Sequence, residues 1–283
     1  MRRLAGFREV AGEYDGFIVD LWGVLHDGVK PYPGAVGCLE GLRAEGKRVV
    51  LLSNAPRRVA AAQRAMRRIG IADDLYGALM TSGEAVHAAL RDRTDPWFAA
   101  LGHRVYHIGP MRDRNVIEGL ELTLVTEPAQ ATFVLNTGPD DERDPTDMAP
   151  FEDELQACRR ARLPMICANP DLEVIRDGVR VLCAGALAAR YQALGGEVRS
   201  IGKPDPAIYG LVLPLLGVPR DRVLAVGDSL RTDIAGAAAA SIPAVWVLGG
   251  IDGDLVGGDP AAPERVAQEA GAQPVAAIPG FFW

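Results

Sequence analysis

Three apolar runs in this sequence each end in polar residues that could act together on a phosphoryl group. Asp20 ends "FIVD", Ser53 and Asn54 end "VVLLSN", and Asp228 ends "VLAVGD". A carboxylate can attack phosphorus, a second carboxylate can bind Mg²⁺, and a hydroxyl can bind a phosphoryl oxygen. Lys203, in the proline-bracketed loop "GKPDP", adds a positive charge for the same anion. These residue types predict a metal-assisted phosphoryl-transfer site.

Short apolar, β-branched runs alternate with helical patterns along most of the chain. The predicted strands cover 15–20, 47–54, 222–229 and 244–250, and the predicted helices lie near 34–46 and 57–69. Continuous apolar strands joined by crossover helices indicate a parallel sheet that is covered on both faces. We therefore predict a doubly wound α/β fold, in which ligands bind beyond the carboxyl ends of the strands. Asp20, Ser53 and Asp228 would meet at that edge.

The middle of the chain is predicted to be a second α/β unit. Its predicted strands are 104–109, 121–126, 131–138, 164–169 and 179–183. We expect a core made of residues 1–80 and 199–283, with residues 81–198 inserted between the two parts. The final segment "QPVAAIPGFFW" is expected to add a small strand or to pack against the core.

The composition excludes several classes of protein. The chain has 283 residues, 48% of them hydrophobic, and a formal net charge of −7, which argues against nucleic acid as a partner. We interpret its densest basic stretch, "PRRVAAAQRAMRRIG", as a solvated helix face. No window approaches the roughly 20 apolar residues of a membrane span. The four cysteines form no C-x-x-C pair, so we expect free thiols and a cytoplasmic, membrane-independent protein.

Six motifs resemble those of the haloacid dehalogenase (HAD) superfamily, in particular subclass IIA, which is similar to sugar and nitrophenyl phosphatases. They are "DLWGVLHDG", "LLSNAP", "TSGEA", "ANPDLEVI", "GKPDPAIY" and "GDSLRTDI". They occur in order over nearly the whole chain. The resemblance implies a Rossmann-like core with an inserted C2-type α/β cap. It also implies a Mg²⁺-dependent hydrolase of small phosphate monoesters, such as sugar or glycerol phosphates. It is compatible with a homodimer.

The resemblance also implies a role for each matched residue. Asp20 would be the nucleophile. The implied Mg²⁺ ligands are Asp20, the main-chain carbonyl of Trp22, Asp228, and Asp233, which would hold either a water on the metal or Lys203. The implied groups for the phosphoryl moiety are Ser53, the main chain of Asn54, Gly23 and Lys203. Asn169 and Asp171 would face the substrate from the cap, or form a hinge.

Trp22 departs from the family pattern. Phosphatases of this family usually carry an aspartate at that position, which protonates the leaving oxygen and later activates water. An indole N–H can donate a hydrogen bond but cannot transfer a proton at neutral pH. Because a general acid–base group contributes about 10²–10⁴ in rate, slow turnover would survive its loss, and good leaving groups would be affected least.

Three interpretations of Trp22 follow. Another residue could supply the proton, and His26 in the next turn has a suitable pKa, although it could equally be an exposed loop residue. The Asp20 carboxylate could instead attack carbon, as in dehalogenases. Those enzymes need no metal, whereas the motif "GDSLRTDI" indicates that this chain still binds one. Finally, the protein could bind a phosphorylated ligand with little or no turnover.

Overall fold

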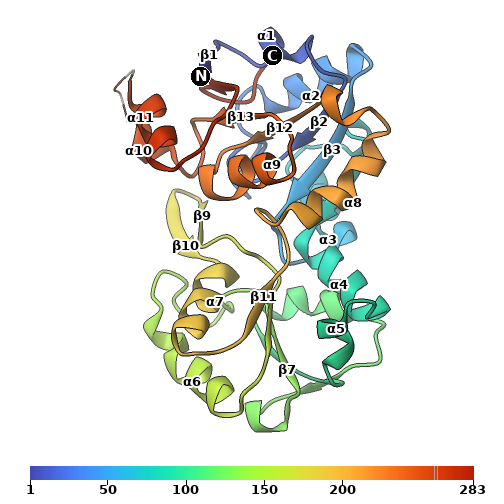
Figure 1. The fold of residues 1–283 in the computed structure, drawn as a ribbon, viewed down its shortest axis with the longest axis vertical. Helices are drawn as coiled ribbons and strands as arrows, with labels where there is room; N and C mark the ends of the chain where they lie inside the picture. Colours follow the sequence, from blue (N-terminus) through green and yellow to red (C-terminus); the bar gives the residue numbers. More distant parts are fainter. Residues whose placement is uncertain (258, 260) are drawn as a thin grey trace.

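The core of the protein is a parallel sheet covered by helices on both faces, as predicted (Figure 1). The structure is a computed structural model that describes residues 1–257, 259 and 261–283. The seven strands lie in the order β1 (Arg2–Arg3), β14 (Ala276–Ile278), β13 (Ala244–Val247), β12 (Val223–Gly227), β2 (Gly16–Val19), β3 (Arg48–Ser53) and β4 (Ala78–Thr81). The C-terminal segment therefore supplies a strand, and it pairs between β13 and β1.

Strand β2 shows why the sheet is covered on both sides. Phe17 and Val19 pack into one hydrophobic cluster, and Ile18 packs into another on the opposite face. The first cluster includes residues of α2 (Ala35–Ala44) and α3 (Val59–Arg68), and the second includes α8 (Pro206–Leu216) and α9 (Ala235–Ala239). Because successive side chains of a strand point to opposite faces, a continuous apolar run requires this arrangement.

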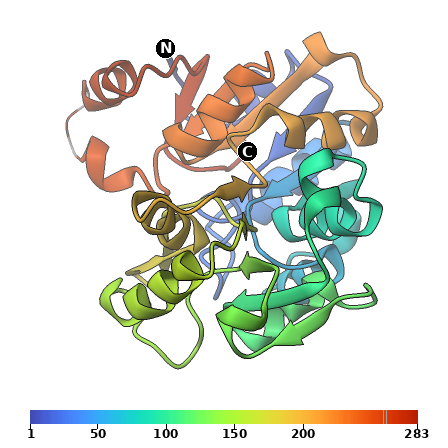
Figure 2. The ribbon, with the colours of Figure 1, turned by 60° about the horizontal axis from the view of Figure 1, so that its bottom comes forward.

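The inserted unit has its own five-stranded parallel sheet. Its order is β11 (Val198–Ser200), β8 (Met165–Cys167), β7 (Phe133–Asn136), β5 (Arg104–Ile108) and β6 (Thr123–Val125). Its helices are α4 (Ser82–Asp92), α5 (Pro96–Ala100), α6 (Glu152–Arg160) and α7 (Ala184–Ala193). Figure 2 shows the green and yellow segments of this unit grouped on one side of the molecule. We keep the boundaries of the inserted unit at 80/81 and 198/199 as a proposal, although strand β11 crosses the second of them.

A separate hairpin, formed by β9 (Glu173–Arg176) and β10 (Val179–Leu182), lies between the two units (Figure 1). The predicted strand at 179–183 therefore exists, but it pairs antiparallel with β9 and belongs to neither large sheet. Arg180 donates hydrogen bonds from this hairpin to the carbonyl of Ile251 and to Asp254. The hairpin thus contacts the loop that leads to α10 (Gly253–Val256) in the core.

The remaining helices are α1 (Arg8–Ala11) and α11 (Ala262–Glu269). Helix α8 begins at Pro206, and Asp205 before it accepts a hydrogen bond from the Ala207 amide. Within the described part of the chain, none of the helices has the length and apolar character that crossing a membrane requires.

Leu39 of α2 is fully buried against the sheet, whereas Leu211 of α8 is 48% exposed. We expect Leu39→Ala to lower the free energy of unfolding by about 2–5 kcal/mol, because it removes buried methyl groups and leaves a cavity. Leu211→Ala is the matched control and should change it by less than about 0.5 kcal/mol. Urea unfolding followed by circular dichroism measures both changes, and equal losses would contradict the packing described here.

Candidate active site

The carboxyl ends of β2, β3 and β12 bring the predicted polar residues to one edge of the core sheet. Asp20 follows β2, Ser53 ends β3, and Asp228 follows β12. The strands are in parallel register, with Val19 opposite both Leu51 and Val226. All three polar residues are buried, and Asp20 is only 7% exposed. The sequence pattern therefore predicted this meeting point correctly.

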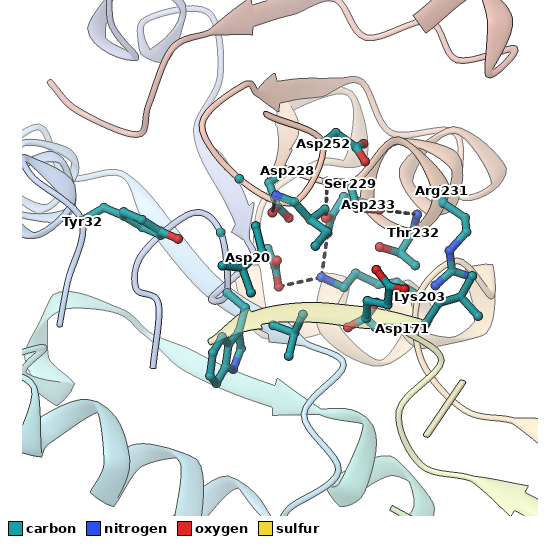
Figure 3. Close-up of a pocket in the computed structure, with 18 residues that line it drawn as sticks. Asp20, Tyr32, Asp171, Lys203, Asp228, Ser229, Arg231, Thr232, Asp233 and Asp252 are labelled. Atoms are coloured by element: carbon teal, nitrogen blue, oxygen red, sulfur yellow. Dashed lines mark hydrogen bonds and ion pairs between the residues drawn. The ribbon is translucent and has the colours of Figure 1, made fainter. Parts of the chain in front are cut away.

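Lys203 is the centre of the cluster (Figure 3). Its Nζ donates hydrogen bonds to Asp20 Oδ1 at 2.7 Å and to Asp233 Oδ1 at 2.6 Å. It also donates to the carbonyl of Leu52 at 3.3 Å. The side chain is 3% exposed. Burial opposes its charge, but Asp20 and Asp233 outweigh that effect and raise the pKa of Lys203 well above its usual value.

Three carboxylates surround one ammonium group in this cluster. Ligand atoms of Asp20, Asp228 and Asp233 lie within 4.8 Å of one another, and all three residues are buried. Burial raises the pKa of Asp20 to about 8, and burial together with Asp20 and Asp233 raises the pKa of Asp228 well above its usual value. Burial is the main cause of both shifts, and three carboxylates beside one ammonium group leave an excess of negative charge. A hard divalent cation with oxygen ligands fits this donor set, because it would compensate that excess.

Two glycines let the main chain approach Asp228 closely. Gly23 has φ of +79°, and a Cβ there would lie 1.8 Å from Asp228 Oδ2; a Cβ on Gly250 would lie 2.1 Å from the same oxygen. The Ile251 amide donates to Asp228 Oδ2 at 2.6 Å. Side chains at these two positions would displace the carboxylate. Gly23 therefore shapes the carboxylate cluster, and its predicted contact with a phosphoryl group stays a prediction.

Asn54 joins the core to the inserted unit. Its Nδ2 donates to Asp171 Oδ1 at 2.9 Å and to the carbonyl of Lys203 at 3.0 Å. Its Oδ1 accepts from the Lys203 amide at 2.8 Å and from Ser82 Oγ at 3.3 Å. One amide side chain thus fixes the lysine loop and holds Asp171 beside it.

Two of the predicted binding residues lie behind the cavity walls. Ser53 is 2% exposed, and its Oγ accepts a hydrogen bond from the Ala55 amide at 3.2 Å. Neither Ser53 nor Asn54 lines the two cavities described below. Asn169 does line one of them, and its Oδ1 accepts from the Asp171 amide at 3.0 Å, which fixes the turn after β8. The predicted contacts of these residues with a phosphoryl group or substrate stay predictions.

Trp22 forms a wall between two cavities. The first, of about 290 Å³, is lined by Asp20, Lys203, Asp228 and Asp233, and the second, of about 270 Å³, extends toward the inserted unit. Trp22 lines both, as do Asp171 and Val174. The indole packs directly on Gly28, where a Cβ would lie 2.2 Å from the ring. The predicted role of the Trp22 carbonyl as a metal ligand stays a prediction.

The structure does not favour His26 as a catalytic acid. The residue is 5% exposed and lines neither large cavity. Its ring packs edge-on against Trp22 with 5.2 Å between centroids, and its Nδ1 accepts from the Gly28 amide. Burial lowers the pKa of His26 to about 4, so the imidazole is neutral near pH 7. The turn therefore uses His26 to support Trp22. The alternative of an exposed loop residue is wrong, and the role of His26 as an acid stays a prediction.

Sequence reasoning missed several residues that line the cavities. Tyr32, Arg231 and Asp252 line the first cavity, and Arg57 and Asp113 line the second. Arg57 belongs to the stretch interpreted as a solvated helix face, but it precedes α3, and its Nε is buried. The sequence offered no local signal for this, because a proline such as Pro56 is compatible with the first turn of a helix.

Known proteins with this arrangement were compared with the chain. Residues 17–123 match the family model described as haloacid dehalogenase-like hydrolase, and residues 200–273 match one described as HAD-hydrolase-like. Chronophin of Mus musculus is 30% identical over 258 residues, which cover 88% of this chain and 86% of chronophin. D-glycerol 3-phosphate phosphatase of Mycobacterium tuberculosis is 26% identical, covering 87% of this chain and 66% of the relative.

A similar solved structure is the haloacid dehalogenase-like family hydrolase of Brucella suis 1330. It is 30% identical, has a TM-score of 0.84, and covers 98% of this chain and 99% of its own. The similarity therefore includes the core and the inserted unit together. The protein belongs to the haloacid dehalogenase-like hydrolase family.

Proposed function

We propose that this protein is a Mg²⁺-dependent hydrolase of small phosphate monoesters that acts through Asp20. The observation that carries the proposal is the buried ammonium of Lys203, which bonds Asp20 and Asp233 at one wall of a cavity also lined by Asp228. Relatives named as phosphatases, including the mycobacterial D-glycerol 3-phosphate phosphatase, support the substrate class.

In the proposed reaction, a carboxylate oxygen of Asp20 attacks phosphorus and the bond from phosphorus to the leaving oxygen breaks. The product is an aspartyl-phosphate and an alkoxide or phenoxide that must take up a proton. Water then attacks the same phosphorus, the bond to the Asp20 oxygen breaks, and phosphate leaves. Lys203 holds Asp20 in place and offsets the charge of the phosphoryl oxygens.

Mg²⁺ held by Asp20, Asp228 and Asp233 would supply Lewis-acid stabilisation of the phosphoryl charge. The protein's own contribution is to hold these carboxylates close together in a buried site. Gly23 and Gly250 allow the close approach, and the Ile251 amide orients Asp228. The metal would also offset the burial and the repulsion from Asp20 and Asp233 that together raise the pKa of Asp228.

Proton transfer is the step in which this chain departs from its family. The indole of Trp22 lines the cavity where an aspartate would otherwise stand, and His26 is buried behind it. The leaving oxygen must therefore take its proton from solvent, and its own basicity decides how much it needs that proton. We propose that turnover is fast only for esters with acidic leaving groups, and that poor leaving groups are bound more readily than they are cleaved.

The first test is phosphate release from p-nitrophenyl phosphate and glycerol 3-phosphate, with Mg²⁺ and with EDTA. We expect release only with Mg²⁺, and we expect Asp20→Asn to reduce it by about 10³-fold or more, because the nucleophile is lost. Asp27→Asn is the matched control, since its carboxylate accepts hydrogen bonds from the Val29 and Lys30 amides outside both cavities.

Two results would reject this function. Tight binding of phosphate esters with no Asp20-dependent release would identify a phospho-ligand binding protein. Release of halide from a haloacid without metal would identify a dehalogenase.

Mg²⁺ binding can be measured without turnover, through thermal stability. We expect saturating MgCl₂ to raise the unfolding midpoint by about 5 °C or more, because a ligand that binds only the folded state stabilises it by mass action. Asp228→Asn should abolish the rise. Asp252→Asn should keep it, because Asp252 lines the same cavity but accepts from the Leu230 amide and lies outside the three-carboxylate cluster. An equal response of both variants would contradict the proposed ligand set.

Trp22→Asp tests the missing acid. We expect it to raise kcat for glycerol 3-phosphate by about tenfold or more, because a carboxyl would then face the cavity and could protonate the alkoxide. The gain should be smaller for p-nitrophenyl phosphate, whose leaving group needs little protonation. Trp22→Asn removes the same ring without adding an acid, so a similar gain from Asn would show that the larger cavity, and not proton transfer, is responsible.

A further inference from the structure

Tyr32 brings a hydroxyl group to the cavity that contains Asp20. It lines that cavity, and Figure 3 shows its phenol extending from the loop before α2 with the oxygen toward Asp20 and Asp228. Among the described residues, none accepts a hydrogen bond from this hydroxyl. Burial raises the pKa of Tyr32 to about 12, and the nearby charge of Asp228 adds to the shift. The hydroxyl therefore keeps its proton near pH 7 and is available as a donor.

The main chain holds Tyr32 in this position. Its amide donates to the carbonyl of Leu25 at 2.9 Å, and its carbonyl accepts from the Ala35 amide at 3.1 Å. Pro31 and Pro33 stand on either side of it. A proline fixes its own φ and restricts the residue before it, so this loop has few alternative conformations. The backbone that carries the phenol is thus fixed before any ligand binds.

The ring of Tyr32 lies at the boundary between the cavity that contains Asp20 and an apolar cavity. The apolar cavity has a volume of about 260 Å³ and is lined mostly by apolar residues such as Val247 and Phe281. Tyr32 and Gly23 line both cavities. A tyrosine suits such a boundary because its ring is apolar and its hydroxyl is polar. The ring can therefore stay packed on the apolar side while the hydroxyl binds a polar ligand on the other.

A phosphoryl group at Asp20 needs hydrogen-bond donors that the residues implied by the sequence do not readily supply. Lys203 has three ammonium protons, and all three are already donated to acceptors of the protein. Ser53 and Asn54 do not line this cavity. The hydroxyl of Tyr32 lines it without such an engagement.

The position of Tyr32 favours contact with the phosphoryl end of an ester over contact with its leaving group. The residues that line both large cavities are Trp22, Asp171 and Val174, so a leaving group that extends toward the inserted unit passes them. Tyr32 lines the first of these two cavities and not the second. The non-bridging phosphoryl oxygens are the part of the ester that stays in the first cavity, beside Asp20.

We infer that Tyr32 is a substrate-binding residue whose hydroxyl donates a hydrogen bond to a non-bridging oxygen of the phosphoryl group at Asp20. This inference rests on the proposed function, because it names a further donor for the same phosphoryl group. A neutral O–H gives the anion a hydrogen bond and adds no charge to the buried cluster. Non-bridging oxygens stay on phosphorus in both steps of the proposed reaction, so the same hydrogen bond serves both and no proton leaves Tyr32.

Binding of inorganic phosphate tests the inference without turnover. In isothermal titration calorimetry with saturating MgCl₂, we expect Tyr32→Phe to weaken phosphate binding by about tenfold or more, because a hydrogen bond to a charged group is lost. The variant keeps the ring, so its unfolding midpoint should stay within about 3 °C of the wild type. Tyr14→Phe is the matched control, because Tyr14 is also half-buried but lines neither large cavity, and it should bind phosphate within about twofold of the wild type.

Turnover gives a second readout, which distinguishes the phosphoryl oxygens from the leaving oxygen. Because p-nitrophenyl phosphate and glycerol 3-phosphate share the phosphoryl group, Tyr32→Phe should lower kcat/KM for both, by factors that agree within about threefold. A loss confined to glycerol 3-phosphate would place the hydroxyl at the leaving oxygen and overturn the inference.

The outcomes separate this inference from the proposed function. Equal phosphate binding by the wild type and Tyr32→Phe overturns the inference even if turnover depends on Asp20. Phosphate binding that depends on Tyr32, without any turnover by the wild type, supports the inference and rejects the hydrolase. No phosphate binding by the wild type, or an equal loss in Tyr14→Phe, also overturns the inference.

Discussion

The burial of Lys203 between two carboxylates is the interaction on which the rest of the site depends. An ammonium group that is 3% exposed is stable only because Asp20 and Asp233 stand at hydrogen-bond distance. Three strands must end at the same edge of the sheet to bring these groups together. Asp228 then adds a negative charge that Lys203 alone cannot offset. A bound divalent cation would offset this excess of negative charge, which is why the proposed function places Mg²⁺ here.

Asn54 extends this constraint from the core to the inserted unit. Its amide bonds both main-chain groups of Lys203 and the carboxylate of Asp171, so the lysine loop and the turn after β8 are held by one side chain. Arg231 adds a second link, because it donates to the carbonyl of Pro170 at 2.8 Å. The inserted unit therefore contacts the core directly beside the loop that carries Lys203.

The sequence was informative wherever a local pattern decided the structure. Strand-end residues such as Asp20 and Asp228 were found because a parallel sheet aligns its carboxyl ends. Asp205 caps α8 through a local pattern of the same kind, an aspartate followed directly by a proline. Arg57 and Asp113 were missed because their pairing joins positions 56 residues apart on two different units, and neither lies in a periodic element. His26 was misjudged because its burial depends on the packing of Trp22, which the sequence does not state.

Trp22 changes two properties of the site at once. Under the proposed function it stands where the family pattern has a proton-transferring aspartate, and its indole lines both the cavity that contains Asp20 and the second cavity. His26 and Gly28 support the ring, one at its edge and the other on its surface. Because His26 and Gly28 are arranged around an indole, the loss of proton transfer that we propose at this position comes with packing that fits the ring.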